Sequence, residues 1–250
     1  MDNDLWLRKY FEEKLILRGD LQKYLEASSV VSVELDHEIA FDLMVLVPDL
    51  MFEGEFKVLF GEYFVVNDQE QSPHVFTRFK SYRWLRKDLS SRLPIALWIF
   101  GKSAIIQDPT KDFGMIIREY AALFSENRED IIRRKYIEFR SDRHNLRQAV
   151  YHQDMLAVDL LRANVIKIAL EILILSHGKP YPYKKWLPSE AKKLKKGQDI
   201  VFICEVFVKE TNLKKVISLS DELVDKIVKI LADNSSLSSG LLNQWWLHLA

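Results

Sequence analysis

The stretch SSVVSVELDHEIAFDLMVLVPD, residues 28–49, decides how the first half of the chain is expected to fold. Residues 30–35 are rich in β-branched side chains and predict a strand. The run IAFDLMVLV at 39–47 is nearly all apolar, which is typical of a strand buried on both faces. Pro48 should end this second strand, and Asp42 is the acid that lies within it.

The sequence around this stretch also favours a small sheet flanked by helices. Residues 4–17 have apolar side chains at a helical period, whereas 56–66 alternate as a strand would. A short strand is expected at 75–79 and a short helix at 82–89. Residues 95–106 contain two apolar runs, and either a helix followed by a strand or a pair of strands fits them.

Beyond Asp108 the apolar pattern changes to the period of helices. Thr110 is a plausible N-cap for the first of them, and 177–183, HGKPYPY, should be a break. Residues 199–209 could form a strand, but their place within a helical half favours a helix. Further helices are expected over 113–124, from about 129 into the 140s, over 146–175 and over 223–231.

These patterns together predict an α+β fold. A small mixed sheet with helices should occupy residues 1–108, and a helical bundle should occupy 109–250. Each part is long enough to enclose a hydrophobic core of its own.

The composition excludes several classes of protein. Lys plus Arg and Asp plus Glu both number 36, so the zero net charge gives no reason to expect RNA or a membrane surface as the main partner. The single cysteine, Cys204, excludes an intramolecular disulfide and a Cys-rich zinc site. Residues 1–18 are charged throughout, so no signal peptide is expected and the cytoplasm is the expected location. Phosphate-loop, dinucleotide-binding, metalloprotease and serine-hydrolase motifs are absent from the sequence.

The stretch 28–49 resembles the DNA polymerase β-type nucleotidyltransferase superfamily. Members typically have a Gly-Ser turn, a spacer of about ten residues, and then a strand with Asp-x-Asp and an apolar run. Ser28 and Ser29 lie where Gly-Ser would be, and Asp42, 13 residues after Ser29, matches the second aspartate. Ala40 occupies the position of the first aspartate, so this motif is degenerate.

The resemblance implies a nucleoside triphosphate held by Ser28 and Ser29, and Mg²⁺ bound by Asp42. Glu62 is the best-placed candidate for a third carboxylate on a neighbouring strand, with Glu53 and Glu55 as alternatives. Carboxylates two residues apart on a strand point to the same face, so Ala40 removes one expected ligand. Among the neighbouring acids, Glu34 and Asp36 could pair, but they fall where the superfamily has a loop, and Glu38 would lie too far from Asp42 to share an ion. All these acids could equally line a solvated sheet edge or turn.

The second half resembles the helical domain of antibiotic and uncharacterised nucleotidyltransferase-like proteins. There, a Tyr/Pro-rich turn precedes a Lys-Trp pair, as HGKPYPYKKWLP does at 177–188. This implies that Lys184, Lys185 and Trp186 contact an acceptor substrate. The alternative is that the tryptophan anchors the bundle while the lysines are solvated. Likewise, Arg140, Arg143 and Arg147 share one helix face that could hold phosphate or RNA, although ion pairs are the commoner use.

Two functions stay open from the sequence. The chain could transfer a nucleoside monophosphate from a nucleoside triphosphate to an unknown acceptor. Alternatively, it could be a catalytically inactive nucleotidyltransferase fold that acts as a ligand-binding or regulatory module, as a homodimer for example. RNA binding is a third and less expected function, and no membrane partner is expected.

Overall fold

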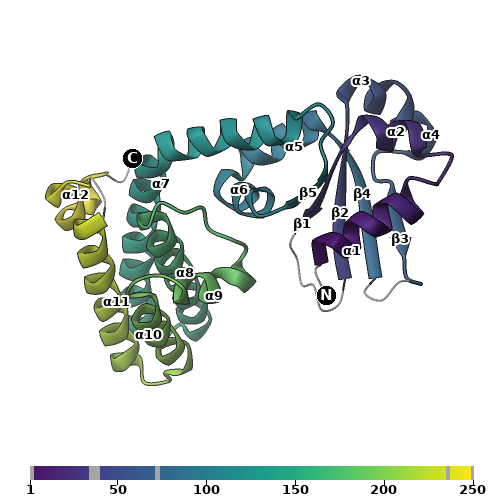
Figure 1. Cartoon of the computed structure of the whole chain (residues 1–250). Helices are drawn as coiled ribbons and strands as arrows, with labels where there is room; N and C mark the ends of the chain where they lie inside the picture. The colour runs from purple at the N-terminus through teal and green to yellow at the C-terminus, as the bar shows by residue number, and fades with distance from the viewer. Residues whose placement is uncertain (1–2, 34–39, 71–73, 235–236, 249–250) are drawn as a thin grey trace. The chain divides into compact units, whose positions relative to one another are not determined.

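The computed structural model describes residues 3–33, 40–70, 74–234 and 237–248, which form two compact units, Met1–Leu123 and Phe124–Ala250. The first unit contains a mixed sheet with helices, and the second is helical (Figure 1). The predicted α+β fold class is therefore confirmed. The predicted domains 1–108 and 109–250 stay a prediction about independent folding. Glu34, Asp36 and Glu38 lie outside the described residues.

The sheet of the first unit has the strand order β3-β4-β2-β1-β5. Strand β2 pairs in parallel with β4, and the other three pairings are antiparallel. The strands are β1 (Ser29–Val33), β2 (Ala40–Val47), β3 (Val65–Asp68), β4 (His74–Ser81) and β5 (Ala104–Gln107). The helical segments of this unit are α1 (Asn3–Tyr10), the π-helical turn η1 (Phe11–Leu15), α2 (Gln22–Ala27), α3 (Asp49–Met51), the π-helical turn η2 (Phe52–Phe56), α4 (Lys57–Phe60), α5 (Tyr82–Ser91) and α6 (Leu93–Gly101).

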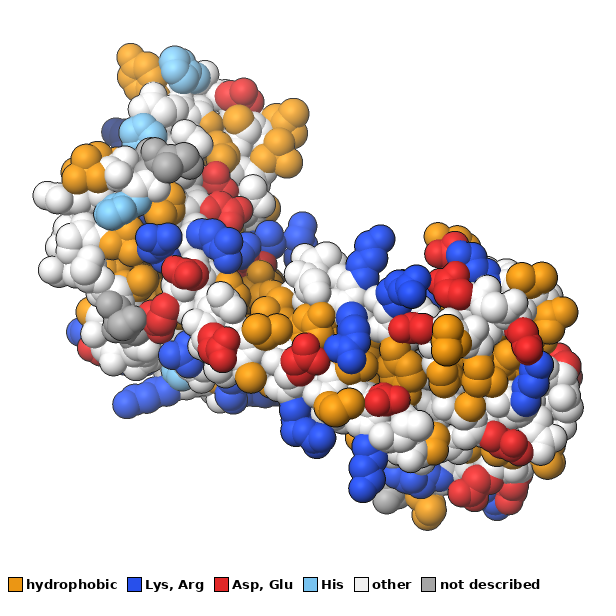
Figure 2. Space-filling model, turned by 90° about the horizontal axis from the view of Figure 1, so that it is seen from above, with side chains coloured by type: hydrophobic (Ala, Val, Ile, Leu, Met, Phe, Trp, Pro, Cys, Tyr) orange, Lys and Arg blue, Asp and Glu red, His pale blue; other side chains and the backbone are white. Residues whose placement is uncertain are grey.

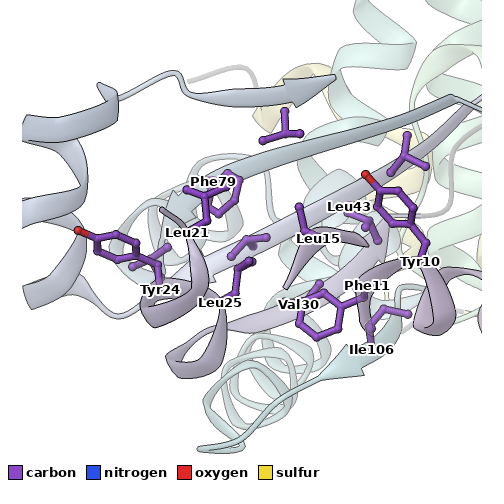
Figure 3. Close-up of a cluster of buried hydrophobic side chains, with 14 of the residues drawn as sticks. Tyr10, Phe11, Leu15, Leu21, Tyr24, Leu25, Val30, Leu43, Phe79 and Ile106 are labelled. Carbon is purple, nitrogen blue, oxygen red and sulfur yellow. The ribbon is translucent and has the colours of Figure 1, made fainter. Parts of the chain in front are cut away.

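One face of the sheet packs into an aromatic-rich core with α1, α2 and η2. Alternate residues of the central strands enter it, such as Val30, Leu43 and Phe79, and meet Leu21 and Leu25 from the chain around α2 (Figure 3). Successive side chains of a strand point to opposite faces, so the residues between these core positions belong to the other face. That other face is called the second face below.

Residues 52–60 are helical, although the sequence pattern predicted a strand beginning at residue 56. The prediction of β structure over 56–66 is wrong up to Phe60, and only β3 remains of it. Phe52, Phe56, Phe60 and Phe64 recur every four residues, which also suits a helix, and the ring centroids of Phe56 and Phe79 lie 5.1 Å apart. Tertiary packing of the rings thus favours the helical period.

Several other predictions are confirmed in the first unit. Strands occur at β1, β2 and β4, helix α5 covers the predicted 82–89, and residues 95–106 form a helix followed by a strand. The guanidinium of Arg8 caps part of the edge strand β5. It donates to the carbonyl of Ile106 at 2.8 Å and also to that of Ile105. A side chain thus satisfies backbone acceptors that an edge strand would leave open.

Helix α7 (Asp112–Tyr151) is one continuous helix of 40 residues, which includes both helices predicted at 113–124 and from about 129 into the 140s. The helix predicted over 146–175 is wrong at its start, because α7 ends at Tyr151 and the next helix begins at Met155. Thr110 is not its cap, because Asp108 accepts the backbone N–H groups of Phe113 and Gly114, the latter at 3.1 Å. The remaining segments are α8 (Met155–Ser176), the 3₁₀ turn η3 (Lys184–Trp186), α9 (Leu187–Lys192), α10 (Gly197–Lys209), α11 (Leu213–Asn234), α12 (Ser239–Asn243) and the 3₁₀ turn η4 (Trp245–His248). The predicted helix at 199–209 is therefore confirmed, and so is the break at 177–183.

The second unit is built around α8, whose last nine residues are all buried. Arg162 of α8 donates to the carbonyls of Val208 and Glu210 at 3.1 and 3.0 Å, which satisfies acceptors at the end of α10. Although α8 is very apolar, neither it nor any other helix among the described residues is long and apolar enough to cross a membrane.

Candidate site on the second face of the sheet

Asp42 lies near the start of β2 and points to the second face of the sheet. Its neighbours in the backbone register are Val33 of β1 and Phe76 of β4. Phe41 and Leu43 on either side of it enter the aromatic core, so the alternation places the carboxylate on the opposite face. Met44, farther along the same face, is buried, and Asp42 itself is 9% exposed. The acid that the sequence singled out is thus almost fully enclosed.

Arg78 of β4 is the charged partner of Asp42. Its Nη2 lies 3.3 Å from Oδ1 of the carboxylate, and its side chain is 48% exposed. That Oδ1 atom is buried and has no hydrogen-bond partner, so the contact is an ion pair without an aligned hydrogen bond. Burial raises the pKa of Asp42, and the Arg78 guanidinium only partly opposes this rise.

Ser28 and Ser29 do not lie beside Asp42. Ser29 pairs with Leu46 in the antiparallel register, four residues along β2 from Asp42, which corresponds to roughly 13 Å. Both serines are fully buried. The Ser29 hydroxyl contacts the Tyr82 hydroxyl and donates to Asp108, while the Ser28 hydroxyl donates to the Tyr24 carbonyl. These bonds connect β1 to neighbouring elements of the unit, and the predicted phosphate contact gains no support from the geometry.

The acids proposed as further ligands also lie away from Asp42 in the fold. Glu62 is exposed in the turn before β3, and β4 separates that strand from β2. Its Oε2 lies 3.8 Å from Nζ of Lys57. Glu53 and Glu55 belong to η2, where they pair with Lys57 and Lys23. All three are therefore engaged in exposed ion pairs.

The described residues around Asp42 do not fit a magnesium site. Its two neighbouring strands read SVVSV and HVFTRFKS, so neither contributes a carboxylate. Within the described part of the chain, no group of three or more His, Cys, Asp or Glu side chains is arranged to hold a metal ion. The charged group that pairs with Asp42 is the Arg78 cation, which repels Mg²⁺.

The candidate acceptor-binding residues belong to the second unit. Lys184 and Lys185 are exposed on η3, and Nζ of Lys185 lies 4.7 Å above the Trp186 ring. Trp186 is half-buried, and its Nε1 is buried without a hydrogen-bond partner. The tryptophan thus packs on the bundle while the lysines face solvent. Their contact with a substrate stays a prediction.

The arginine face of α7 is occupied by contacts within the second unit. Arg143 and Arg147 both bind Asp221 of α11, the latter at 2.8 Å, and Arg140 donates to the carbonyl of Leu242 at 3.1 Å. This agrees with the ion-pair interpretation of these residues rather than with a free phosphate-binding face. Figure 2 shows the same intermixing of charge more generally, because Lys and Arg side chains are interspersed with Asp and Glu over the visible surface.

Sequence reasoning missed the cations of β4. Arg78 and Lys80 alternate with the core residues Val75 and Phe79, which puts both on the second face with Asp42. The alternation in HVFTRFKS was the available signal. It could not be used, because the parallel pairing of β4 with β2 joins residues more than thirty positions apart in sequence.

The described fold is that of a nucleotidyltransferase-like protein. A crystal structure of a nucleotidyltransferase-like protein from Exiguobacterium sibiricum 255-15 matches with a TM-score of 0.55 over 96% of this chain and 78% of that chain. Only 12% of the residues are identical, so the likeness concerns the fold alone. No family model matches this chain. No curated protein matches it either.

Proposed function

We propose that this chain uses a nucleotidyltransferase-like fold to bind a nucleoside triphosphate as a ligand-binding or regulatory module, without metal-dependent nucleotidyl transfer. The observation that supports this most is the Asp42–Arg78 ion pair on the second face of the sheet. Metal-dependent transfer requires several carboxylates that neutralise a divalent cation, whereas here Asp42 pairs with a guanidinium in place of a metal ion.

The retained aspartate has a different task in this proposal. A buried carboxylate beside Arg78 holds the guanidinium in place, and a guanidinium has five N–H donors, so others remain for a ligand. The exposed half of the Arg78 side chain is the part that a phosphate can reach.

Calorimetry with ATP, CTP and GTP tests the proposal when each titration is run once with Mg²⁺ and once with EDTA. We expect at least one nucleotide to bind with comparable affinity in both buffers. Binding that requires Mg²⁺ and is lost in Asp42→Ala would instead support transfer of a nucleoside monophosphate, with Asp42 as a metal ligand. Absence of binding to all three nucleotides contradicts both functions. If the chain instead binds RNA with a steep salt dependence, this result would favour the third function considered, RNA binding.

A further inference from the structure

Lys80 lies in an aromatic setting at the end of β4. Its Nζ is 4.6 Å from the ring centroid of Tyr63 and 5.8 Å from that of Trp84, and it donates to the Glu62 carbonyl at 3.1 Å. An ammonium has three N–H donors, so this bond leaves others for a ligand. The two rings and the carbonyl hold the cation in a defined position.

Arg78 and Lys80 lie two residues apart on the same strand and point to the same face. The strand repeat places them roughly 6–7 Å apart along the chain. Burial lowers the pKa of Lys80; the nearby Glu62 opposes this, and the positive charge of Arg78 lowers the pKa further. Two cations that disfavour each other on one face are stabilised together by a bound anion.

Tyr63 adds an aromatic surface beside Lys80. It lies in the turn before β3 and is 80% exposed, which is unusual for so large a ring. Its neighbour Val65 is 45% exposed and lies opposite Arg78 in the antiparallel register of β3 and β4. An exposed ring beside Lys80, on the strand that also carries Arg78, offers stacking for a base near charge for phosphates.

We propose that Arg78 and Lys80 bind the phosphates of a nucleoside di- or triphosphate, and that Tyr63 stacks against its base. This inference rests on the proposed nucleotide binding and names the residues responsible for it. The phosphates take the place of solvent at the free donors of Arg78 and Lys80. Asp42 acts only as a positioning residue, because it binds the guanidinium rather than the ligand.

Titration of ATP, adenosine and inorganic tripolyphosphate in EDTA separates the two contributions. We expect Arg78→Gln and Lys80→Gln each to weaken ATP and tripolyphosphate binding by about tenfold, because each removes one charged contact. Lys80→Arg should retain most of the affinity. Tyr63→Ala should weaken ATP binding about tenfold and tripolyphosphate binding much less, because only ATP has a base to stack and Lys80 keeps its contacts with Trp84 and the Glu62 carbonyl. Tyr63→Phe should bind like the wild type.

Lys87→Gln is the matched control, because Lys87 is an exposed cation on α5 with no role in the proposed site. Thermal unfolding of each variant checks that it folds. If the wild type binds ATP but folded Arg78→Gln, Lys80→Gln and Tyr63→Ala bind it equally well, this assignment is wrong while nucleotide binding stands. If the wild type binds neither ATP nor tripolyphosphate, the proposed function itself fails.

Discussion

Thr77 carries a buried hydroxyl group without a hydrogen-bond partner. The residue is fully buried in β4, and it lies opposite Leu43 of β2 and Val66 of β3 in the registers of the sheet. An unpaired buried hydroxyl loses its bond to water without replacement. Valine has nearly the same shape and no hydroxyl, so we expect Thr77→Val to raise the free energy of unfolding by about 1 kcal/mol.

Urea unfolding measures the change, and Thr77→Ala is the control. Alanine removes the hydroxyl and also a methyl group, so it leaves a cavity and should be less stable than the valine variant by about 1 kcal/mol or more. A valine variant that unfolds at lower urea than the wild type would show that the hydroxyl has a partner in solution.

Single residues also mark how far the sequence could predict the site. Asp42 was found because it matches the second aspartate of the strand motif that the sequence resembles, 13 residues after Ser29. The ion-pair partner of Asp42 could not be found in this way, because Arg78 becomes a neighbour of Asp42 only through the parallel pairing of β2 and β4. Ser29 shows the converse, because its spacing to Asp42 is right along the chain but the antiparallel register carries it to the other end of β2. Spacing constrains neighbours only when the register is known.

At the scale of elements, the spacing of the apolar residues predicted most helices and strands. It gave the wrong element where the same residues fit both a helical and a strand period. Phe56, Phe60 and Phe64 satisfy a helical repeat as well as a strand repeat. Contacts with rings distant in sequence, such as Phe79, then favour the helix. The 40 residues of α7 show a different limit, because no strong break separates the two helices that were expected.

Packing of α7 against α8 includes a buried ion pair that can be tested. Nζ of Lys135 lies 2.9 Å from Oε2 of Glu171, and Nζ of Lys167 lies 3.7 Å from Oε1. The Glu171 side chain is 3% exposed and that of Lys135 is 19% exposed. Glu171→Gln leaves Lys167 without this carboxylate and leaves Lys135 with Glu138, whose Oε2 lies 3.5 Å from its Nζ. We therefore expect it to lower the free energy of unfolding by about 2 kcal/mol, less than for a fully buried pair.

The pH dependence gives a second measurement of this pair. Burial is the largest influence on the pKa of Lys135 and lowers it, but the hydrogen bond and charge of Glu171, with smaller contributions from Tyr181 and Glu138, together raise the pKa by more. A group with a raised folded pKa stabilises the fold below its unfolded value, near 10.5, and loses that contribution as the pH rises through the folded value. The wild type should therefore lose stability above pH 10.5 more steeply than Glu171→Gln. Equal slopes would contradict the assignment, and Lys135→Met/Glu171→Met should recover part of the loss.

At the scale of the molecule, the change from a mixed sheet to helices was readable from the sequence, because each half buries its apolar residues at its own period. The predicted boundary at 108/109 stays a prediction about where independent folding ends. The sequence pattern changes at Asp108, yet the compact units divide between Leu123 and Phe124, within a continuous helix. A division inside a helix leaves no Pro, Gly or polar linker by which a sequence could mark it.

The first part of α7 should therefore be needed for the first unit to fold. Phe113 and Ile116 are buried in that unit, and the Tyr120 hydroxyl donates to the Arg86 carbonyl at 3.2 Å. Burial of the first two side chains contributes roughly 1.5–3 kcal/mol each, together a large fraction of the stability of a domain. We expect a fragment of residues 1–123 to unfold cooperatively in urea, and a fragment of 1–108 to be markedly less stable or unfolded. Comparable stability of the two fragments would instead place the folding boundary at Asp108, where the sequence pattern changes.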